Sequence, residues 1–238
     1  RLLTVIPLGA AEGSRPVRYF PLVGWLFAGI AVGIASGAVA LGRASGIGAV
    51  LVATLIVSGW ALTAGFLHWD GLADCADALG VRGDAQRRLA VMRESGIGAF
   101  GVVAIVLVAA VQVSAAAVVV DSGAWWALGA APVVGRLSAA LALMTRTPAR
   151  ADGLAARYAR RESVPGWIVL AVPVVALAAV GPLAARAVAL GVGVIIAAVT
   201  PGFFTRRLGG ITGDVLGASV LLVEAFVLTI GALAGSAL

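Results

Sequence analysis

Three aspartates lie close together in the segment His68-Trp69-Asp70-Gly71-Leu72-Ala73-Asp74-Cys75-Ala76-Asp77. Asp70, Asp74 and Asp77 are spaced i, i+4 and i+7, so in a helix their carboxylates share one face. Like charges stacked in this way repel one another unless a cation neutralises them, and Mg²⁺ prefers carboxylate oxygens together with substrate phosphates. The spacing therefore predicts a Mg²⁺ site that binds a phosphorylated substrate. A solvated acidic helix without chemistry is the alternative.

A glycine-rich segment further along the chain carries another candidate acid. It reads Gly209-Gly210-Ile211-Thr212-Gly213-Asp214, and its glycines permit tight turns that bring backbone N–H groups close to a ligand. Asp214 is available to a metal ion or to a substrate hydroxyl. The alternative is an ordinary turn in which Asp214 caps the helix that follows. The role of His68 stays open between a general base, a partner of another site residue and an interfacial hydrogen-bonding residue.

Two arginines are candidates for contacts to phosphate. Arg93 is followed by Glu94-Ser95-Gly96, and a guanidinium beside serine and glycine can hold phosphate oxygens through bidentate and backbone hydrogen bonds. Membrane topology explains the same arginine equally well. Arg136 lies about ten residues inside an apolar run, which is about 15 Å at the helical rise, and a charge inside a membrane marks a functional candidate. Glu224, within the last apolar run, is a candidate partner for it.

The elements that position these residues are membrane helices. Of the 238 residues, 61% are hydrophobic and 12% are charged, with a mean hydropathy of +1.08, whereas a soluble domain has about 25% charged residues. Uncharged apolar runs long enough to cross a bilayer cover residues 20–42, 44–67, 97–120, 123–145, 164–185, 187–205 and 215–238. The sequence predicts an all-α fold, a polytopic membrane helix bundle of about seven transmembrane helices, forming a single domain over residues 1–238.

The arginines indicate which ends of these helices face the cytoplasm. With seven crossings, one side receives fourteen of the 17 arginines: Arg1, Arg15, Arg18, Arg82, Arg87, Arg88, Arg93, Arg146, Arg150, Arg157, Arg160, Arg161, Arg206 and Arg207. The other side receives Arg43 and Arg186. The positive-inside rule then places the N-terminus and the motif segments in the cytoplasm, with the C-terminus outside and the active site at the cytoplasmic edge of the membrane.

The same distribution decides between partners. The arginines lie in gaps between apolar runs and form no stripe with interleaved aromatic residues, so we expect the lipid bilayer as a partner and no nucleic acid. A homo-oligomer is compatible with the sequence. Because the first residue is Arg1 and not Met, we expect residues to precede it in the natural protein.

The motifs together resemble the cobalamin synthase family, whose members are adenosylcobinamide-GDP ribazoletransferases. The resemblance covers nearly the whole chain, and the two aspartate motifs are specific only in combination. The chain departs from the family pattern at Ala78, Glu94 and Gly96. The motifs that carry the resemblance are residues 20–24 (FPLVG), 68–77 (HWDGLADCAD), 92–98 (MRESGIG), 135–136 (GR), 148–154 (PARADGL) and 209–214 (GGITGD).

The resemblance implies a reaction between two nucleotide-like substrates. A ribose hydroxyl of α-ribazole, or of its 5′-phosphate, attacks a phosphorus of the diphosphate in adenosylcobinamide-GDP, and GMP leaves, with Mg²⁺ as the expected cofactor. Positioning and electrostatics do most of the work in such a transfer. The residues divide into metal ligands, catalytic residues and substrate contacts: Asp70, Asp74 and Asp77 for Mg²⁺; Asp214 and the competing base His68 for catalysis; Arg93, Arg136, Arg150, Gly210 and Thr212 for substrate.

Two other classes of membrane protein stay open at this point. CDP-alcohol phosphotransferases also bind metal and a diphosphate with aspartates on membrane helices, but their signature Asp-x-x-Asp-Gly-x-x-Ala-Arg and its trailing aspartates are not met here. A transporter would place its polar groups near the membrane midplane and show internal repeats. Here most acids are expected at one membrane edge.

Overall fold

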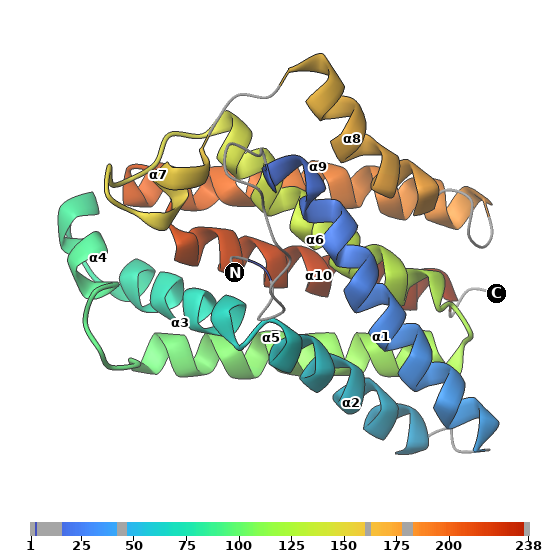
Figure 1. Ribbon diagram of the computed structural model, residues 1–238. Helices are drawn as coiled ribbons and strands as arrows, with labels where there is room; N and C mark the ends of the chain where they lie inside the picture. The colour runs from blue at the N-terminus through green and yellow to red at the C-terminus, as the bar shows by residue number, and fades with distance from the viewer. Residues whose placement is uncertain (1–2, 4–15, 42–46, 160–162, 178–182, 236–238) are drawn as a thin grey trace.

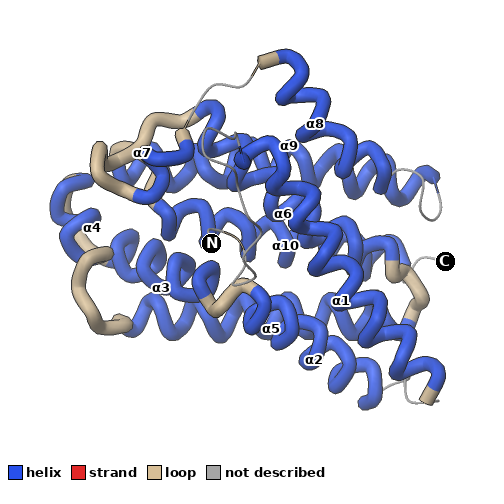
Figure 2. The backbone as a smooth tube through the Cα atoms, in the orientation of Figure 1, coloured by secondary structure: helices blue, strands red, loops and turns tan. Residues whose placement is uncertain are grey.

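The computed structural model describes residues 3, 16–41, 47–159, 163–177 and 183–235. The regular elements in these ranges are helices, apart from one isolated parallel bridge between Pro148 and Ile211, so the predicted all-α class is confirmed (Figure 2). The helices are η1 (Pro16–Tyr19), α1 (Phe20–Ala40), α2 (Ile47–Thr63), α3 (Leu67–Gly80), α4 (Ala85–Val91), α5 (Ala99–Asp121), α6 (Trp126–Thr145), α7 (Leu154–Tyr158), α8 (Val164–Ala176), α9 (Leu183–Leu208) and α10 (Gly213–Gly235).

The predicted number of seven membrane crossings is not confirmed. Among the described residues, four helices are long and apolar enough to span a bilayer, namely α1 with η1, α5, α6 and α10. The α2–α3 pair adds a fifth only if the two helices are counted as one broken span, because they meet at an angle of 89°. The run at 164–185 contains α8, which has only 13 residues, and the beginning of α9.

Helices α6 and α10 form the centre of the bundle. Their most apolar 18-residue windows are 94% and 78% buried, whereas those of the α1 and α5 spans are 28% and 33% buried. Figure 1 shows α1, α5 and α9 running along this central pair. Burial on all sides agrees with the α6 sequence, which is mostly apolar and rich in alanine and glycine.

The bend between α2 and α3 shapes the region of the first aspartate motif. Two consecutive residues at the bend, Gly65 and Phe66, have positive φ angles of 61° and 58°. Helix α3 begins directly after them and continues through Asp77 to Gly80. The prediction that the three aspartates lie on one helix is therefore confirmed.

The motif segments gather at one end of the bundle. In Figure 1 this end holds α4, α7, the C-terminal ends of α3, α6 and α9, and the N-terminal ends of α5 and α10. Segments 92–98, 146–153 and 209–212 connect these helix ends. Five arginines used above to assign the sides of the membrane, Arg1, Arg15, Arg43, Arg160 and Arg161, lie outside the described residues.

Candidate active site

Helices α3 and α10 touch through their backbones, and this contact joins the two aspartate motifs. A Cβ atom added to Gly71 of α3 would lie 2.7 Å from the carbonyl oxygen of Asp214 and 2.8 Å from its Cα atom. A Cβ atom on Gly217 of α10 would lie 2.9 Å from the Cα atom of His68. Only glycine permits so close an approach. The two glycines therefore bring Asp214 beside the first motif, 137 residues after Asp77 in the chain.

The carboxylates at this contact act on one another electrostatically. Asp74 is half-buried. Its carboxylate is repelled by the negative charges of Asp214, Asp70 and Asp77, in decreasing order of strength. Such a group of like charges favours a bound cation. Among the described residues, no three His, Cys, Asp or Glu side chains converge as a ready-made metal site. A metal ion here would take part of its coordination from substrate phosphate and water, as Mg²⁺ usually does.

Asp77 has a different environment from the other two members of its motif. Its carboxylate accepts hydrogen bonds from the backbone N–H groups of Gly98 (2.7 Å) and Gly101 (2.8 Å) at the start of α5. These N–H groups have no partner inside their own helix, so Asp77 caps α5 from the neighbouring helix α3. The role of Asp77 as a metal ligand stays a prediction. The structure shows a second role for this residue, the stabilisation of the start of α5.

The glycine-rich segment is held against the chain that follows α6. Ala149 donates a backbone hydrogen bond to the Ile211 carbonyl, and Ile211 donates one to the Thr147 carbonyl, both at 2.9 Å. Gly210 permits this pairing, since a Cβ atom there would lie 2.5 Å from the backbone nitrogen of Ala149. The pairing places Arg150 close enough to Asp214 for their charges to interact.

Thr212, and not Asp214, caps α10. The backbone N–H of Val215 donates to the Thr212 hydroxyl at 3.2 Å. Asp214 lies in the first turn of α10, half-buried, where the helix dipole stabilises its negative charge. Asp214 also lines a small cavity of about 180 Å³, together with Arg150, Gly153 and Thr212.

A larger cavity of about 890 Å³ lies between α2, α3, α5 and the segment before α5. Asp70 and Asp74 are on its wall, as are Glu94 and Ser95 of the third motif. The volume is in the range of ligand pockets, about 300–1,000 Å³. Asp70 and Asp74 of α3 thus line one cavity, and Asp214 of α10 lines another.

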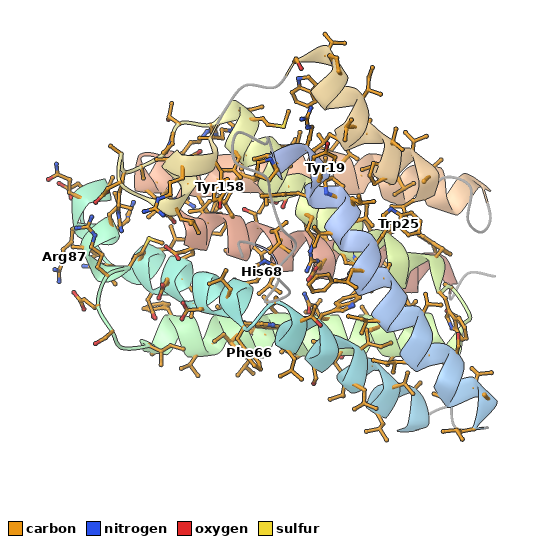
Figure 3. The ribbon with its side chains drawn as sticks, viewed as in Figure 1. Tyr19, Trp25, Phe66, His68, Arg87 and Tyr158 are labelled. Carbon is orange, nitrogen blue, oxygen red and sulfur yellow. The ribbon has the colours of Figure 1, made fainter. Side chains whose placement is uncertain are left out.

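Arg136 and His68 lie deeper in the bundle. Arg136 is 1% exposed, forms an ion pair with Glu224, and stacks over the Phe27 ring at 3.7 Å. His68 is 3% exposed and lines a void of about 10 Å³ together with Arg136, Gln112 and Glu224. Figure 3 shows His68 between α3 and α10. The suggested Arg136–Glu224 pairing is confirmed. The Arg136 guanidinium, which we expected to contact substrate phosphate, is paired with the Glu224 carboxylate instead.

Arg93 is exposed, and the described residues that line the larger cavity include its neighbours Glu94 and Ser95 but not Arg93 itself.

Two features were missed by the sequence analysis. Gln112 donates hydrogen bonds to the Leu221 carbonyl at 3.1 Å and to Glu224 at 3.5 Å, and its amide in an apolar run was a visible signal. The positive φ of Phe66 had no sequence signal beyond the preceding glycine.

Comparison with known proteins shows that the whole chain, motifs included, is similar to one family of enzymes. The model of the cobalamin-5-phosphate synthase family matches residues 1–232. An adenosylcobinamide-GDP ribazoletransferase of Pseudomonas putida (strain GB-1) is 38% identical over 90% of this chain and 86% of its own length. A protein of the same name from Ralstonia pickettii (strain 12J) is 35% identical over 94% of this chain and 90% of its own length.

No solved structure matches the chain. The family match covers nearly the whole sequence and includes every segment that forms the α3–α10 site. The chain therefore belongs to the cobalamin-5-phosphate synthase family.

Proposed function

We propose that this protein is an adenosylcobinamide-GDP ribazoletransferase, the activity named for its relatives. The observation that carries the proposal is the α3–α10 contact, which sets Asp70 and Asp74 on one side and Asp214 with Arg150 on the other. Two cavities lined by carboxylates that interact across this contact suit a reaction between two substrates, one of which carries a diphosphate.

In the proposed reaction a ribose hydroxyl of α-ribazole, or of its 5′-phosphate, attacks the phosphorus attached to the cobinamide side of the diphosphate. The new P–O bond replaces the bond to the GMP oxygen, GMP departs with that electron pair, and the hydroxyl proton passes to a base. Asp214 is the proposed base, because it lines a cavity while His68 is enclosed between α3 and α10. Arg150, Gly210 and Thr212 hold substrate phosphate beside it.

Mg²⁺ is the proposed cofactor, with Asp70 and Asp74 as its protein ligands. When bound, the ion would neutralise phosphate oxygens and polarise the reacting phosphorus. Asp74 already faces three other negative charges. This acidic wall would repel the diphosphate unless a bound cation neutralised it. Activity is therefore expected to depend on Mg²⁺ in full.

The proposed location is the cytoplasmic membrane of a prokaryote, with the motif end of the bundle in the cytoplasm. The described arginines of segments 82–93, 146–157 and 206–207 all lie on elements of that end, which supports the positive-inside orientation. This end also faces the compartment that contains nucleotides.

Release of GMP tests the proposal. Purified protein in detergent, given adenosylcobinamide-GDP, α-ribazole and Mg²⁺, should produce GMP and a corrinoid enlarged by the ribazole, and EDTA should stop both. Asp74→Asn keeps the shape of the side chain and removes its charge, so turnover should fall by about 10²-fold or more. Asp84→Asn is the matched control, because Asp84 caps α4 and asparagine caps equally well.

The outcome also separates the other classes considered above. GMP release that requires neither α-ribazole nor Mg²⁺ contradicts the proposal. Uptake of a corrinoid into vesicles without GMP release indicates a transporter. Activity of Asp74→Asn within a few-fold of the parent protein at saturating Mg²⁺ removes the α3 aspartates from the mechanism.

A further inference from the structure

The larger cavity extends well beyond the aspartates. In the described part of the chain its charged lining residues are Asp70, Asp74 and Glu94, all acidic, on α3 and on the segment before α5. Much of the remaining wall comes from α2, from the bend and from α5: Val57, Ser58, Ala61, Leu62, Phe66, Ile105 and Ala109. The segment before α5 adds Ser95, Gly96 and Ile97 beside Glu94. The cavity therefore carries its acidic groups on α3 and the segment before α5, and its wall along α2 and α5 is mostly apolar.

Two aromatic residues, Phe66 and Trp69, also line the cavity. Phe66 has a φ of 58°, a backbone conformation that bulky residues rarely adopt and that is found preferentially at ligand sites. The conformation leaves the Phe66 side chain 54% exposed instead of buried among the helices. In Figure 3, Phe66 lies on the opposite side of α3 from His68.

The chemistry of the proposed substrates selects one occupant. The corrin ring with its amide side chains and the guanine base carry many hydrogen-bonding groups, and burying these against an apolar wall without partners is costly. The base of ribazole is a flat, apolar benzimidazole ring, which suits aromatic and aliphatic walls. Its ribose carries hydroxyl groups, which suit carboxylate acceptors.

We propose that the larger cavity is the ribazole site, with the base against Phe66, Trp69 and the apolar wall and the ribose toward Asp70 and Asp74. This inference rests on the proposed function. The diphosphate of the second substrate is then left to the α3–α10 contact itself, between Asp70 and Asp74, the proposed Mg²⁺ ligands, and the smaller cavity that Arg150 and Asp214 line. Ala61 and Ala109, small residues of the wall, set the room left for the base.

Adjacent alanines of α5 provide a matched pair of variants. Ala109 lines the cavity, whereas Ala110 is exposed on the outer face of the helix. Ala109→Phe should raise the Kd for α-ribazole, measured by equilibrium dialysis without the second substrate, and its KM in turnover. We expect a rise of at least about tenfold, equivalent to about 1.4 kcal/mol. Ala110→Phe should leave both within about twofold, and KM for adenosylcobinamide-GDP should not change in either variant.

A second variant protects the test against misfolding. Leu62 lines the cavity and is 62% exposed, so Leu62→Trp can be accommodated without repacking the core and should also weaken ribazole binding. Equal Kd values for the Ala109, Leu62 and Ala110 variants, in a parent protein that releases GMP, overturn the cavity assignment and leave the proposed function standing. Ribazole binding that depends on Ala109 in a parent protein without GMP release supports the cavity assignment and contradicts the proposed function. Loss of co-purified phospholipid from Ala109→Phe at an unchanged ribazole Kd identifies the cavity as a lipid site and refutes the proposal.

Discussion

The buried ion pair between Arg136 and Glu224 permits a quantitative test of how α6 and α10 are held together. The two side chains are 1% and 2% exposed, and Arg136 also stacks on Phe27 at 3.7 Å. Removing one partner of a buried pair leaves an uncompensated charge and typically costs about 3–5 kcal/mol, whereas replacing both by apolar residues is often close to neutral. Glu224→Leu and Arg136→Met should each destabilise the protein by that amount.

The double variant should recover most of the loss, because neither charge then remains buried. Methionine at position 136 also keeps a contact to the Phe27 ring, since sulfur packs favourably against aromatic edges. The expected order of stability is parent, then double variant, then either single variant. Ser219→Ala is the control: the Ser219 hydroxyl is fully buried without a hydrogen-bond partner among the described residues, so its removal should cost little.

Cys75 provides the assay. It is the one cysteine of the chain and is 0% exposed, so a thiol-reactive fluorescent dye reports unfolding in detergent as the temperature rises. A double variant as unstable as the single ones would refute the explanation by uncompensated charge. A double variant that is stable but has lost about 10²-fold or more of its turnover would show that the Arg136–Glu224 pair is needed for catalysis as well as for stability.

Three further predictions test the site and its orientation. Asp214→Asn should abolish most turnover at unchanged thermal stability, whereas Thr212→Ala should lower stability by about 0.5–2 kcal/mol through the lost cap; an active Asp214→Asn protein would remove the proposed base. Gly71→Ala forces a methyl group against the backbone of Asp214, so turnover should fall together with stability, and an unaffected variant would show that α3 and α10 lie further apart than the structure has them. A cysteine introduced at Asp84 should react with impermeant reagents only in inside-out vesicles, and labelling in intact cells would reverse the orientation.

The sequence by itself determined the class of the protein and the chemistry of its motifs. Mean hydropathy and uncharged runs predict membrane helices for a general reason, since backbone polar groups in lipid must be satisfied within the helix itself. The helical spacing of Asp70, Asp74 and Asp77 likewise depends only on local geometry, and α3 confirms it. The motif resemblance agrees with the family to which the chain belongs.

Tertiary structure decided how these elements meet and what each polar residue contacts. Asp77 caps α5, Thr212 caps α10, and Arg136 is paired with Glu224, although all of them appeared in the sequence as candidates for substrate or metal. Partners of this kind come from helices distant in the chain, so no local pattern contains them. The 89° bend that separates α2 from α3 was also invisible in a continuous apolar run. The joining of Asp214 to the first motif depends on the approach of two helix backbones at Gly71 and Gly217, which is a property of packing and not of either segment alone.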